Sequence, residues 1–392
     1  MSVRQTSKHE LAVQVGRRYA KASRAAKSAL LTEFVASTGY HRKYAIWLLR
    51  HGPPRRRKRG GRPPTYGLAV AAGLRVVAEA LNWICGKRLQ AALADMVPAL
   101  EREGALKLGP EDRAALLRMS AATIDRRLAL DRQQAQARGL STTKPGTLLK
   151  QQIPVHTFTP WEDQRPGFVE IDLVAHCGTT TAGHYLNTLT VVDVATGWTD
   201  VVGIWGKGQQ AVLAALQAVR ERLPFPLLGI DSDNGSEFLN DHLLRYCRQE
   251  QLTFTRSRPY WKNDQAHVEQ KNYSVVRRLV GYSRYESEEA LAQFERVYAL
   301  VRVYVYGWQP VFKLIAKERD GAKVRKHYDH PQTPLRRALN SGLLDAGQQA
   351  ELLAQMTAVG PLALHRQLNA AEELLWRYRA SPGIPHLPGV AV

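Results

Sequence analysis

The chain has 392 residues, of which 44% are hydrophobic, and a formal net charge of +20. That length predicts two to four domains, and the apolar share is ordinary for a folded protein. A surface this basic repels itself unless it meets a polyanion, so nucleic acid is the first partner to consider. A basic protein without a nucleic-acid role is the alternative that charge alone leaves open.

The three cysteines lie far apart, at positions 85, 177 and 247, and none belongs to a Cys-x-x-Cys pair. This spacing argues against a disulfide framework and a structural zinc site, and it fits a reducing cytosol. No run approaches the roughly 18 apolar residues of a membrane span. The first residues lack the charged and apolar segments of an export signal. We therefore expect a cytoplasmic protein without a membrane partner.

Positive charge is concentrated in residues 1–66, which hold 16 Lys and Arg against two acidic residues. Residues 26–50 have the apolar periodicity of two short helices, with Gly39 between them. A glycine between two short helices is typical of a helix-turn-helix, so residues 1–52 are predicted to form a helix-turn-helix DNA-binding domain. The second helix would present two basic residues to the major groove near its start, Arg42 and Lys43.

A Pro- and Arg-rich run follows, and residues 53–64 have no apolar side chain larger than proline. Such a run cannot form a core, so residues 53–66 are interpreted as a basic linker. We expect an extended arm that lies over DNA phosphates, and a merely solvated linker is the alternative. The basic side chains of the arm are Arg55, Arg56, Arg57, Lys58, Arg59 and Arg62.

Residues 67–140 return to helical patterns and are predicted to form a second helical domain with a helix-turn-helix. Ser120 is a good N-cap for its last helix, and Ile124 and Leu128 would pack inward. An ordinary packed helical bundle is the alternative. Three residues of this helix could face a DNA groove, namely Thr123, Arg126 and Arg127. A linker at 141–159 follows.

After Pro166 the pattern changes from helical to extended. Three strands are predicted at 168–177, 185–194 and 198–205, followed by helices at 209–223, 236–251 and 264–279 that alternate with short strands at 227–231 and 252–255. This is the element order of an RNase H-like α/β fold, which we assign to residues 160–285. Residues 286–392 are predicted to be a mostly α-helical C-terminal region. The fold class is therefore multidomain, with an all-α N-terminal region, an α/β core and a mostly α C-terminal region.

Three acidic residues are candidates for phosphodiester chemistry, which two Mg²⁺ ions about 3.5–4 Å apart can support through clustered carboxylates. Asp172 lies in the first strand among apolar residues, where an unpaired carboxyl is costly. Glu170 shares its face by the two-residue period and is its rival. Asp233 ends a short strand that also contains Asp231. Glu269 lies near a predicted helix start.

The sequence Asp-Asn-Gly-Ser-Glu-Phe at 233–238, followed by Glu269 after 35 intervening residues, resembles the D,D-35-E signature of retroviral integrases and related bacterial transposases. Wider features are similar to insertion-sequence transposases of the ISNCY-type group; they are Lys144-Pro145-Gly146, Val169-Glu170-Ile171-Asp172, Glu269-Gln270-Lys271-Asn272, and Asp329 with Thr333-Pro334. The resemblance implies that Asp172 bridges two Mg²⁺ ions, with Mn²⁺ as a substitute, and that Asp233 and Glu269 each hold one. It also implies that Glu170 and Asp231 are not ligands.

Residues around Glu269 are further candidates for contact with DNA. Gln265 and Asn272 lie one turn before and one turn after Glu269, where they would flank the metals or the DNA end. Lys271 could bind phosphate, and a solvated charged face is the alternative. Tyr260, in the preceding loop, could stack on unpaired bases.

The sequence therefore predicts a DNA transposase that binds the ends of an insertion element, frees a 3′-OH and joins it to target DNA. Two ends must be joined, so a homodimer or larger synaptic assembly on double-stranded DNA is expected, in the bacterial cytoplasm and associated with the nucleoid. The first alternative is a metal-dependent nuclease that cleaves without joining. The second is a DNA-binding regulator with an inactive RNase H-like fold.

Overall fold

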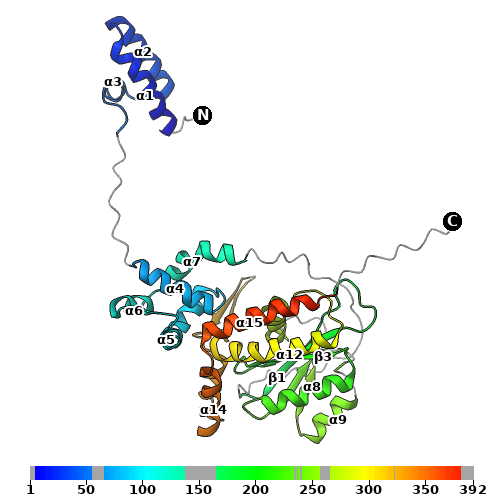
Figure 1. The fold of residues 1–392 in the computed structure, drawn as a ribbon. Coiled ribbons are helices and arrows are strands. Elements are labelled where there is room, and N and C mark those ends of the chain that lie inside the picture. The colour runs from blue at the N-terminus through cyan, green and yellow to red at the C-terminus, as the bar shows by residue number, and fades with distance from the viewer. Residues whose placement is uncertain are drawn as a thin grey trace, which may run out of the picture. The chain divides into compact units, whose positions relative to one another are not determined.

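The structure is a computed structural model that describes residues 5–54, 66–136, 165–233, 235, 237–238, 241–256, 265–321 and 323–380. Contacts divide the chain into two compact units, residues 1–65 and 66–392, which are described separately (Figure 1). None of the helices in the described residues is long and apolar enough to cross a membrane.

The first unit consists of three helices packed on a small core. They are α1 (Gln5–Lys21), α2 (Arg24–Thr38) and α3 (Arg42–His51). Gly39 ends α2 in the left-handed region, with φ of 70°, and its N–H donates to the carbonyl of Val35. Leu31, Phe34 and Leu48 fill the space between the helices. The two helices predicted on either side of Gly39 are present, and α1 precedes them.

The second unit begins with four helices, and the last of them buries the side chains that the sequence predicts to face the core. They are α4 (Leu68–Ala80), α5 (Gly86–Arg102), α6 (Pro110–Leu117) and α7 (Ala121–Gln136). The Ser120 hydroxyl accepts a hydrogen bond from the Thr123 amide at the start of α7. Ile124 and Leu128 are buried, as predicted from their spacing.

A five-stranded mixed sheet with the strand order β3-β2-β1-β4-β5 forms the centre of the second unit. Its strands are β1 (Phe168–Ala175), β2 (Leu186–Asp193), β3 (Thr199–Trp205), β4 (Gly229–Ser232) and β5 (Thr253–Arg256). The first three strands are antiparallel neighbours, whereas β4 is parallel to both β1 and β5. The predicted fold class is confirmed.

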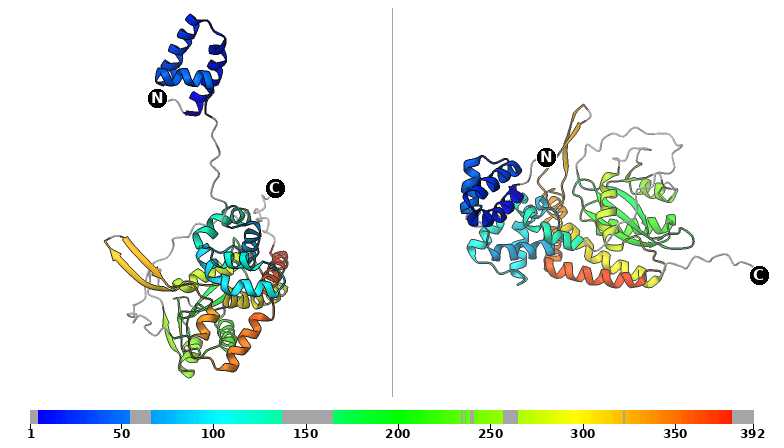
Figure 2. Two further views of the ribbon diagram at one scale, coloured as in Figure 1. Left: turned by 90° about the vertical axis from the view of Figure 1, so that its left-hand side faces the viewer. Right: turned by 90° about the horizontal axis from the view of Figure 1, so that it is seen from above.

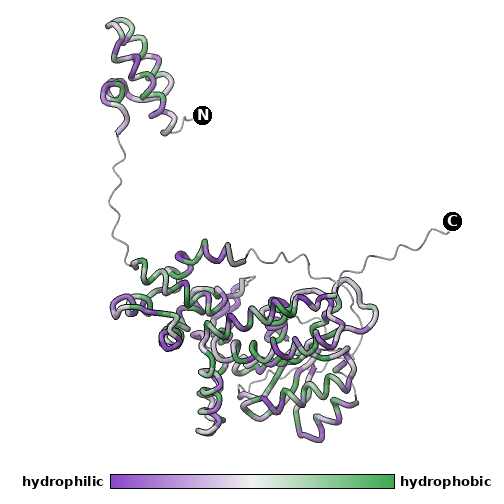
Figure 3. Tube along the Cα trace, viewed as in Figure 1, coloured by the Kyte–Doolittle hydropathy of each residue, from purple (hydrophilic) through white to green (hydrophobic). Residues whose placement is uncertain are grey.

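Helices cover both faces of this sheet, and the alternation of strand residues decides which side chains each face receives. The core beneath α8 (Gln209–Arg222) and α9 (Asp241–Gln249) takes residues such as Val169, Ile171 and Ile230. The opposite face is covered by α10 (Ala266–Lys271) and α12 (Glu288–Val303). Figure 3 shows polar and apolar residues alternating along these helices.

One hydrophobic core joins α4–α7, the α12 face of the sheet and the C-terminal helices. It includes Leu93 from α5, Phe294 from α12 and Leu368 from α15 (Pro361–Leu375). The remaining C-terminal helices are α13 (Pro334–Leu339) and α14 (Ala346–Thr357). The three parts that the sequence places at 67–140, 160–285 and 286–392 therefore share a core, because helices far apart in the chain bury their apolar faces against one another.

The C-terminal region also contains a two-stranded antiparallel hairpin, β6 (Leu314–Asp320) and β7 (Lys323–Tyr328), that the sequence reading did not predict. It projects away from the rest of the second unit in both views of Figure 2. The region is mostly α-helical, as predicted, and the hairpin is an addition to that prediction.

The start of α15 is capped by a carboxylate that lies just after α5. This contact offers a test of the core that the two helices share. Glu103, which follows α5, accepts hydrogen bonds from the amides of Leu362 and Ala363 at 3.3 and 2.7 Å. Gly360 precedes α15, and a Cβ there would lie 2.4 Å from the Glu103 carboxyl carbon. A side chain from a distant part of the sequence therefore satisfies the first amides of α15.

We predict that Glu103→Ala lowers the free energy of unfolding by about 1–2 kcal/mol, as the loss of an N-cap does. Chemical denaturation of the full chain measures it. Glu79→Ala is the matched control, because Glu79 also pairs with α15, through Arg366 at 3.6 Å, but at the surface. The control is expected to lose less than about 0.5 kcal/mol, and equal losses in the two variants would contradict the capping role.

Candidate active site

The register between β1 and β4 places two rows of acidic residues side by side. The parallel pairing sets Glu170 opposite Asp231 and Ile171 opposite Ser232. One residue further along each strand lie Asp172 in β1 and Asp233, which follows the end of β4. Side chains two apart share a face, so an inner pair and an outer pair of carboxyls lie on the same face. The outer pair lies at the carboxyl end of β4.

The inner carboxyls are buried and hold other elements of the core. Glu170 is 5% exposed, and its Oε2 accepts a hydrogen bond from the Val268 amide at 2.9 Å. Burial is the main reason that the pKa of Glu170 rises to about 8. Asp231 is 2% exposed, and its Oδ1 accepts a hydrogen bond from the Thr255 hydroxyl of β5 at 2.6 Å. Glu170 therefore ties β1 to the start of α10.

The outer carboxyl of Asp172 is partly exposed and is held by two donors. The Asn272 amide donates to Oδ2 at 2.6 Å, and the Leu173 backbone N–H donates to Oδ1 at 2.8 Å. Burial, which is the largest cause, and the negative charges of Asp233 and Glu269 together raise the pKa of Asp172 to about 7, against the lowering effect of its two hydrogen bonds. Asp172 is thus close enough to Asp233 and to Glu269 to be repelled by each of them.

Asp233 lies in the first turn beyond β4, where a glycine amide orients it. The Gly235 N–H donates to Asp233 Oδ1 at 2.9 Å. Burial raises the pKa of Asp233, and the charge of Glu237 raises it too, whereas the Gly235 hydrogen bond lowers it. A carboxylate in this position faces the crevice at the end of β4.

The helix that carries Glu269 is fastened to β1 at both of its ends. At the start, Val268 bonds to Glu170, and just past the end, Asn272 bonds to Asp172. Glu269 itself is exposed between these two ties. Asn272 begins a π-helical segment (Asn272–Arg277), a form that often occurs at functional sites. The two ties set the position of Glu269 relative to Asp172.

Two oxygen atoms at this edge are buried without a hydrogen-bond partner among the described residues. Thr190 is the cross-strand neighbour of Asp172 in β2, and its Oγ1 is unpaired. The Oδ1 atom of Asn272 is unpaired as well. Buried polar atoms ordinarily have partners, so these atoms indicate a site for a polar ligand or ion. Carboxylate, amide and hydroxyl oxygens are donors that suit a hard cation such as Mg²⁺.

The described positions do not gather a complete ligand set. Among the residues that the structure describes, no three His, Cys, Asp or Glu side chains are close enough together to hold one metal ion. The carboxylate, amide and hydroxyl oxygens nevertheless suit a divalent cation chemically, and the repulsion around Asp172 is of the kind that a cation relieves.

Comparisons with known proteins show the family of this chain. Residues 162–262 match the family model described as integrase core domain. The chain is 45% identical over 333 residues to the uncharacterized protein y4rM of Sinorhizobium fredii (strain NBRC 101917 / NGR234), covering 84% of this chain and 94% of that protein. The chain belongs to that family and is a DDE transposase/integrase-type protein. Its narrower ISNCY-type grouping stays a prediction.

Solved integrase cores are also similar to parts of this integrase-type chain. The catalytic core domain of BIV integrase matches with a TM-score of 0.31 and 18% identity, covering 45% of this chain and 95% of that one. The HTLV-2 integrase catalytic core domain, solved in complex with magnesium in a dimeric form, matches with a TM-score of 0.29 and 14% identity, covering 38% and 91%.

The other predicted DNA-binding residues of the integrase-type protein lie in several places. Arg42 and Lys43 are exposed at the start of α3 in the first unit. On α7, Arg126 and Arg127 are exposed, but Arg126 donates to the Thr123 hydroxyl at 3.2 Å and Arg127 to the Tyr66 carbonyl at 3.2 Å. The basic-arm residues and Tyr260 lie outside the described residues; they are Arg55, Arg56, Arg57, Lys58, Arg59, Arg62 and Tyr260.

Lys271 was predicted to bind phosphate, with a solvated charged face as the alternative; its burial contradicts the alternative, and phosphate binding stays a prediction. Lys271 is 8% exposed, and burial together with the charge of Arg88 lowers its pKa to about 7. Its side chain points inward because α10 is pressed against β1 and β2. Gln265 is buried too, at 7% exposure, whereas Asn272 reaches the predicted neighbourhood of the metals through Asp172.

The sequence did not predict the roles of two polar residues of the site, Glu170 and Thr190. The role of Glu170 as a tie to α10 has no local signal, because the partner amide is 98 residues away. Thr190 could have been found only by aligning β1 with β2, where its period matches that of Asp172.

The raised pKa of Asp172 predicts a pH-dependent response to divalent cations. Unfolded Asp172 ionises near its usual pKa of 3.8, whereas the folded group retains its proton until about pH 7. The folded state therefore loses stability as pH rises through this window, and the loss is complete above it. A cation bound to the ionised carboxylates would offset the loss.

We predict that Mg²⁺ or Mn²⁺ raises the melting temperature more at about pH 8 than at about pH 5, as thermal denaturation can measure. Asp172→Asn removes the ionising group, so the cation-free variant should be more stable than the wild type at the higher pH. Its melting temperature should also respond less to the cation. A cation effect of equal size at the two pH values, in both proteins, would contradict this assignment.

Proposed function

We propose that this protein is a DNA transposase that binds the ends of an insertion element, cleaves them to free a 3′-OH and joins that hydroxyl to target DNA. The observation that carries the proposal is the repulsion of Asp172 by Asp233 and by Glu269, on the face of the sheet where β1 pairs with β4. Like charges that lie close together destabilise the folded state, and sites that keep them together are commonly functional. The 35-residue interval between Asp233 and Glu269 supports the same proposal.

Asp172, Asp233 and Glu269 would hold two Mg²⁺ ions, with Asp172 as the shared ligand and one further carboxylate for each ion. When bound, such a pair of ions activates the attacking oxygen and stabilises the leaving oxygen of an in-line phosphoryl transfer. The donors around the carboxylates fit this role. Asn272 and the Leu173 amide fix the Asp172 oxygens, and the Gly235 amide fixes one Asp233 oxygen.

The residues behind the carboxylates keep the site in shape during the reaction. Glu170 accepts the Val268 amide and so holds the start of α10 against β1. Asp231 accepts the Thr255 hydroxyl and so links β4 to β5. Catalytic groups that are held by a second layer of hydrogen bonds need little reorganisation when the transition state forms.

DNA recognition is proposed for the basic parts of the chain. The helices around Gly39, with Arg42 and Lys43, and the basic linker 53–66 would bind the element ends, together with Arg126 on α7. Joining two ends to one target requires at least two catalytic cores, so a homodimer or larger synaptic complex is the expected active form. The reaction would take place on DNA in the bacterial cytoplasm.

We predict that Asp233→Asn abolishes end cleavage and strand transfer, because the amide keeps the shape of the side chain but loses the charge that holds a cation. Binding to end DNA should stay near the wild-type value. The two activities are measured with labelled element-end duplexes and Mg²⁺ or Mn²⁺. Glu286→Gln is the control, because Glu286 pairs with Arg284 away from the triad, and it should retain activity. Joining at the wild-type rate by Asp233→Asn would overturn the assignment.

A second measurement separates the transposase from the alternatives. Ends that already carry a free 3′-OH need only the joining step, so the transposase should insert them into plasmid DNA with Mg²⁺. A nuclease would degrade these substrates without joining them, and a catalytically inactive regulator would bind them unchanged. Either outcome would replace the proposed function.

A further inference from the structure

The hairpin of β6 and β7 is a projecting arm that packs mainly on itself. Its two strands pair closely with each other, and no other described helix or strand makes extensive contact with either of them. In both views of Figure 2 the arm extends beyond the helices of the second unit. Seven residues of β6 span about 23 Å at roughly 3.3 Å per residue. An isolated two-stranded hairpin is at best marginally stable in water, so its retention calls for a reason.

The root of the arm, in contrast, is firmly anchored by Asp329. The Asp329 carboxylate accepts the Lys313 amide at 2.7 Å, and the Asp329 amide donates to the Lys313 carbonyl at 2.9 Å. The other Asp329 oxygen pairs with Arg337 of α13 at 2.7 Å, and the side chains of that pair are 21% and 12% exposed. The Lys313 ammonium donates to the carbonyl of Ala195 in the connection between β2 and β3.

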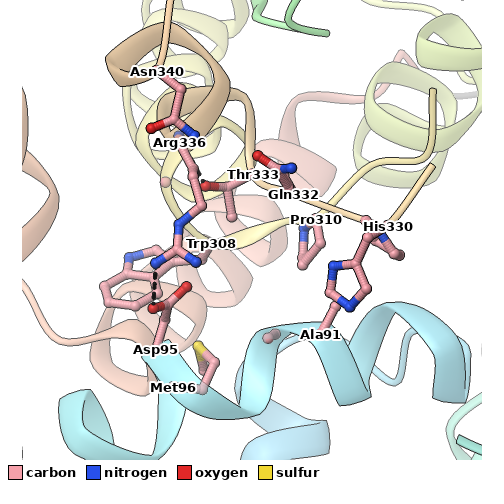
Figure 4. A pocket seen from close by; sticks show the side chains of 13 residues that line it. Ala91, Asp95, Met96, Trp308, Pro310, His330, Gln332, Thr333, Arg336 and Asn340 are labelled. Carbon is pink, nitrogen blue, oxygen red and sulfur yellow. Dashed lines mark hydrogen bonds and ion pairs between the residues drawn. The ribbon is translucent and has the colours of Figure 1, made fainter.

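A second set of contacts holds the root to α5. Thr333 caps α13 by accepting the Arg336 amide at 3.2 Å, and Arg336 pairs with Asp95 of α5 at 2.8 Å. Figure 4 shows this pair at one side of a pocket of about 270 Å³, with Trp308 beside it and His330 at the other side. Asp329, Thr333 and Pro334, which the sequence singles out, thus build a rigid base for an arm that touches little else.

Charge is distributed unequally between the two faces of the arm. Residues opposite each other in the register share a face. One face has the opposed positions Glu318 with Arg325 and Asp320 with Lys323, so its charges alternate in sign. His327 also pairs with Glu318, at 3.2 Å.

The other face has no acidic position among its opposed pairs. Lys317 is opposite Lys326, and Arg319 is opposite Val324. Arg319 and Lys326 are exposed.

We propose that the face of the arm with Arg319 and Lys326 binds the sugar-phosphate backbone of double-stranded DNA. A two-stranded ribbon is narrow enough to enter or follow the major groove, which is about 12 Å wide. The two exposed cations of one face can contact phosphates, and the face whose charges alternate in sign can turn toward solvent. The choice of DNA as ligand rests on the proposed function, but binding by the arm requires no catalysis.

The experiment compares two double variants of the full chain that lose the same charge. Arg319→Gln/Lys326→Gln removes two cations from the binding face, and Lys323→Gln/Arg325→Gln removes two from the opposite face. Fluorescence anisotropy with a random-sequence duplex, in EDTA and over a range of salt, measures affinity without chemistry. Each lost phosphate contact lowers the slope of log K against log salt by about 0.9. We expect the first variant to lower it by about 1.8 and the second to leave it near the wild-type value.

Equal effects of the two variants, or none, would overturn the proposal, with circular dichroism and melting curves showing that both are folded. A change of oligomeric state in the first variant, with the salt slope unchanged, would instead assign the face to a second copy of the chain. The outcomes remain separate from those of the proposed function. If the two variants differ in salt slope but the wild type shows no strand transfer, the transposase function is refuted and DNA binding by the arm is retained. If the wild type shows strand transfer but the variants do not differ in slope, the transposase function is retained and DNA binding by the arm is refuted.

Discussion

The parallel pairing of β1 with β4 is the constraint on which the rest of the site depends. It sets Glu170 opposite Asp231 and brings Asp172 level with Asp233, so four carboxyls gather on one face of the sheet. A slip by one residue would send one strand's acids to the opposite face, beneath α8 and α9, where the core is apolar. The hydrophobic positions next to the acids, such as Ile171 and Ile230, are fully buried and exclude that slip. Packing on one face therefore fixes the chemistry on the other.

The two rows of carboxyls have different tasks because they differ in depth. Burial raises the pKa of Glu170 to about 8 and that of Asp172 to about 7, so both disfavour the folded state once they ionise. Glu170 gains a backbone hydrogen bond from Val268 in exchange, and that bond places the helix carrying Glu269. Asp172 gains an amide hydrogen bond from Asn272, at the other end of the same helix. The stability lost at the site is offset by the large core that α4–α7, α12 and α15 share.

Sequence periodicity and spacing predicted the strands, their order along the chain and the candidate acids, because these depend on local patterns and on one fixed interval. They could not predict how Glu170 would be used, since a two-residue period assigns a face but not a partner. The burial of Lys271 was not predicted for a similar reason, because a helix of six residues has too few positions to show which face is buried. The hairpin had a signal in Asp320-Gly321 between two runs, with Gly321 at φ of 58°, but its many charges resemble a solvated helix. The shared core involves contacts between distant segments, which no local pattern reveals.

The anchoring of the arm connects it mechanically to the candidate active site. Lys313 bonds to the turn that joins β2 to β3, and β2 is the strand that places Thr190 beside Asp172. On the other side, Arg88 of α5 donates to the Pro310 carbonyl and to the Gln309 side chain, just before the arm begins. Both attachments are partly buried hydrogen bonds, and they link the base of the arm to the sheet on one side and to α5 on the other. A duplex held along the arm would then lie in a fixed relation to the carboxylates, which is the condition that positional catalysis requires, since misplacement by about 1 Å can cost about 100-fold in rate. A weak hairpin on a well-anchored base is understandable if its ligand is the same DNA on which the site acts.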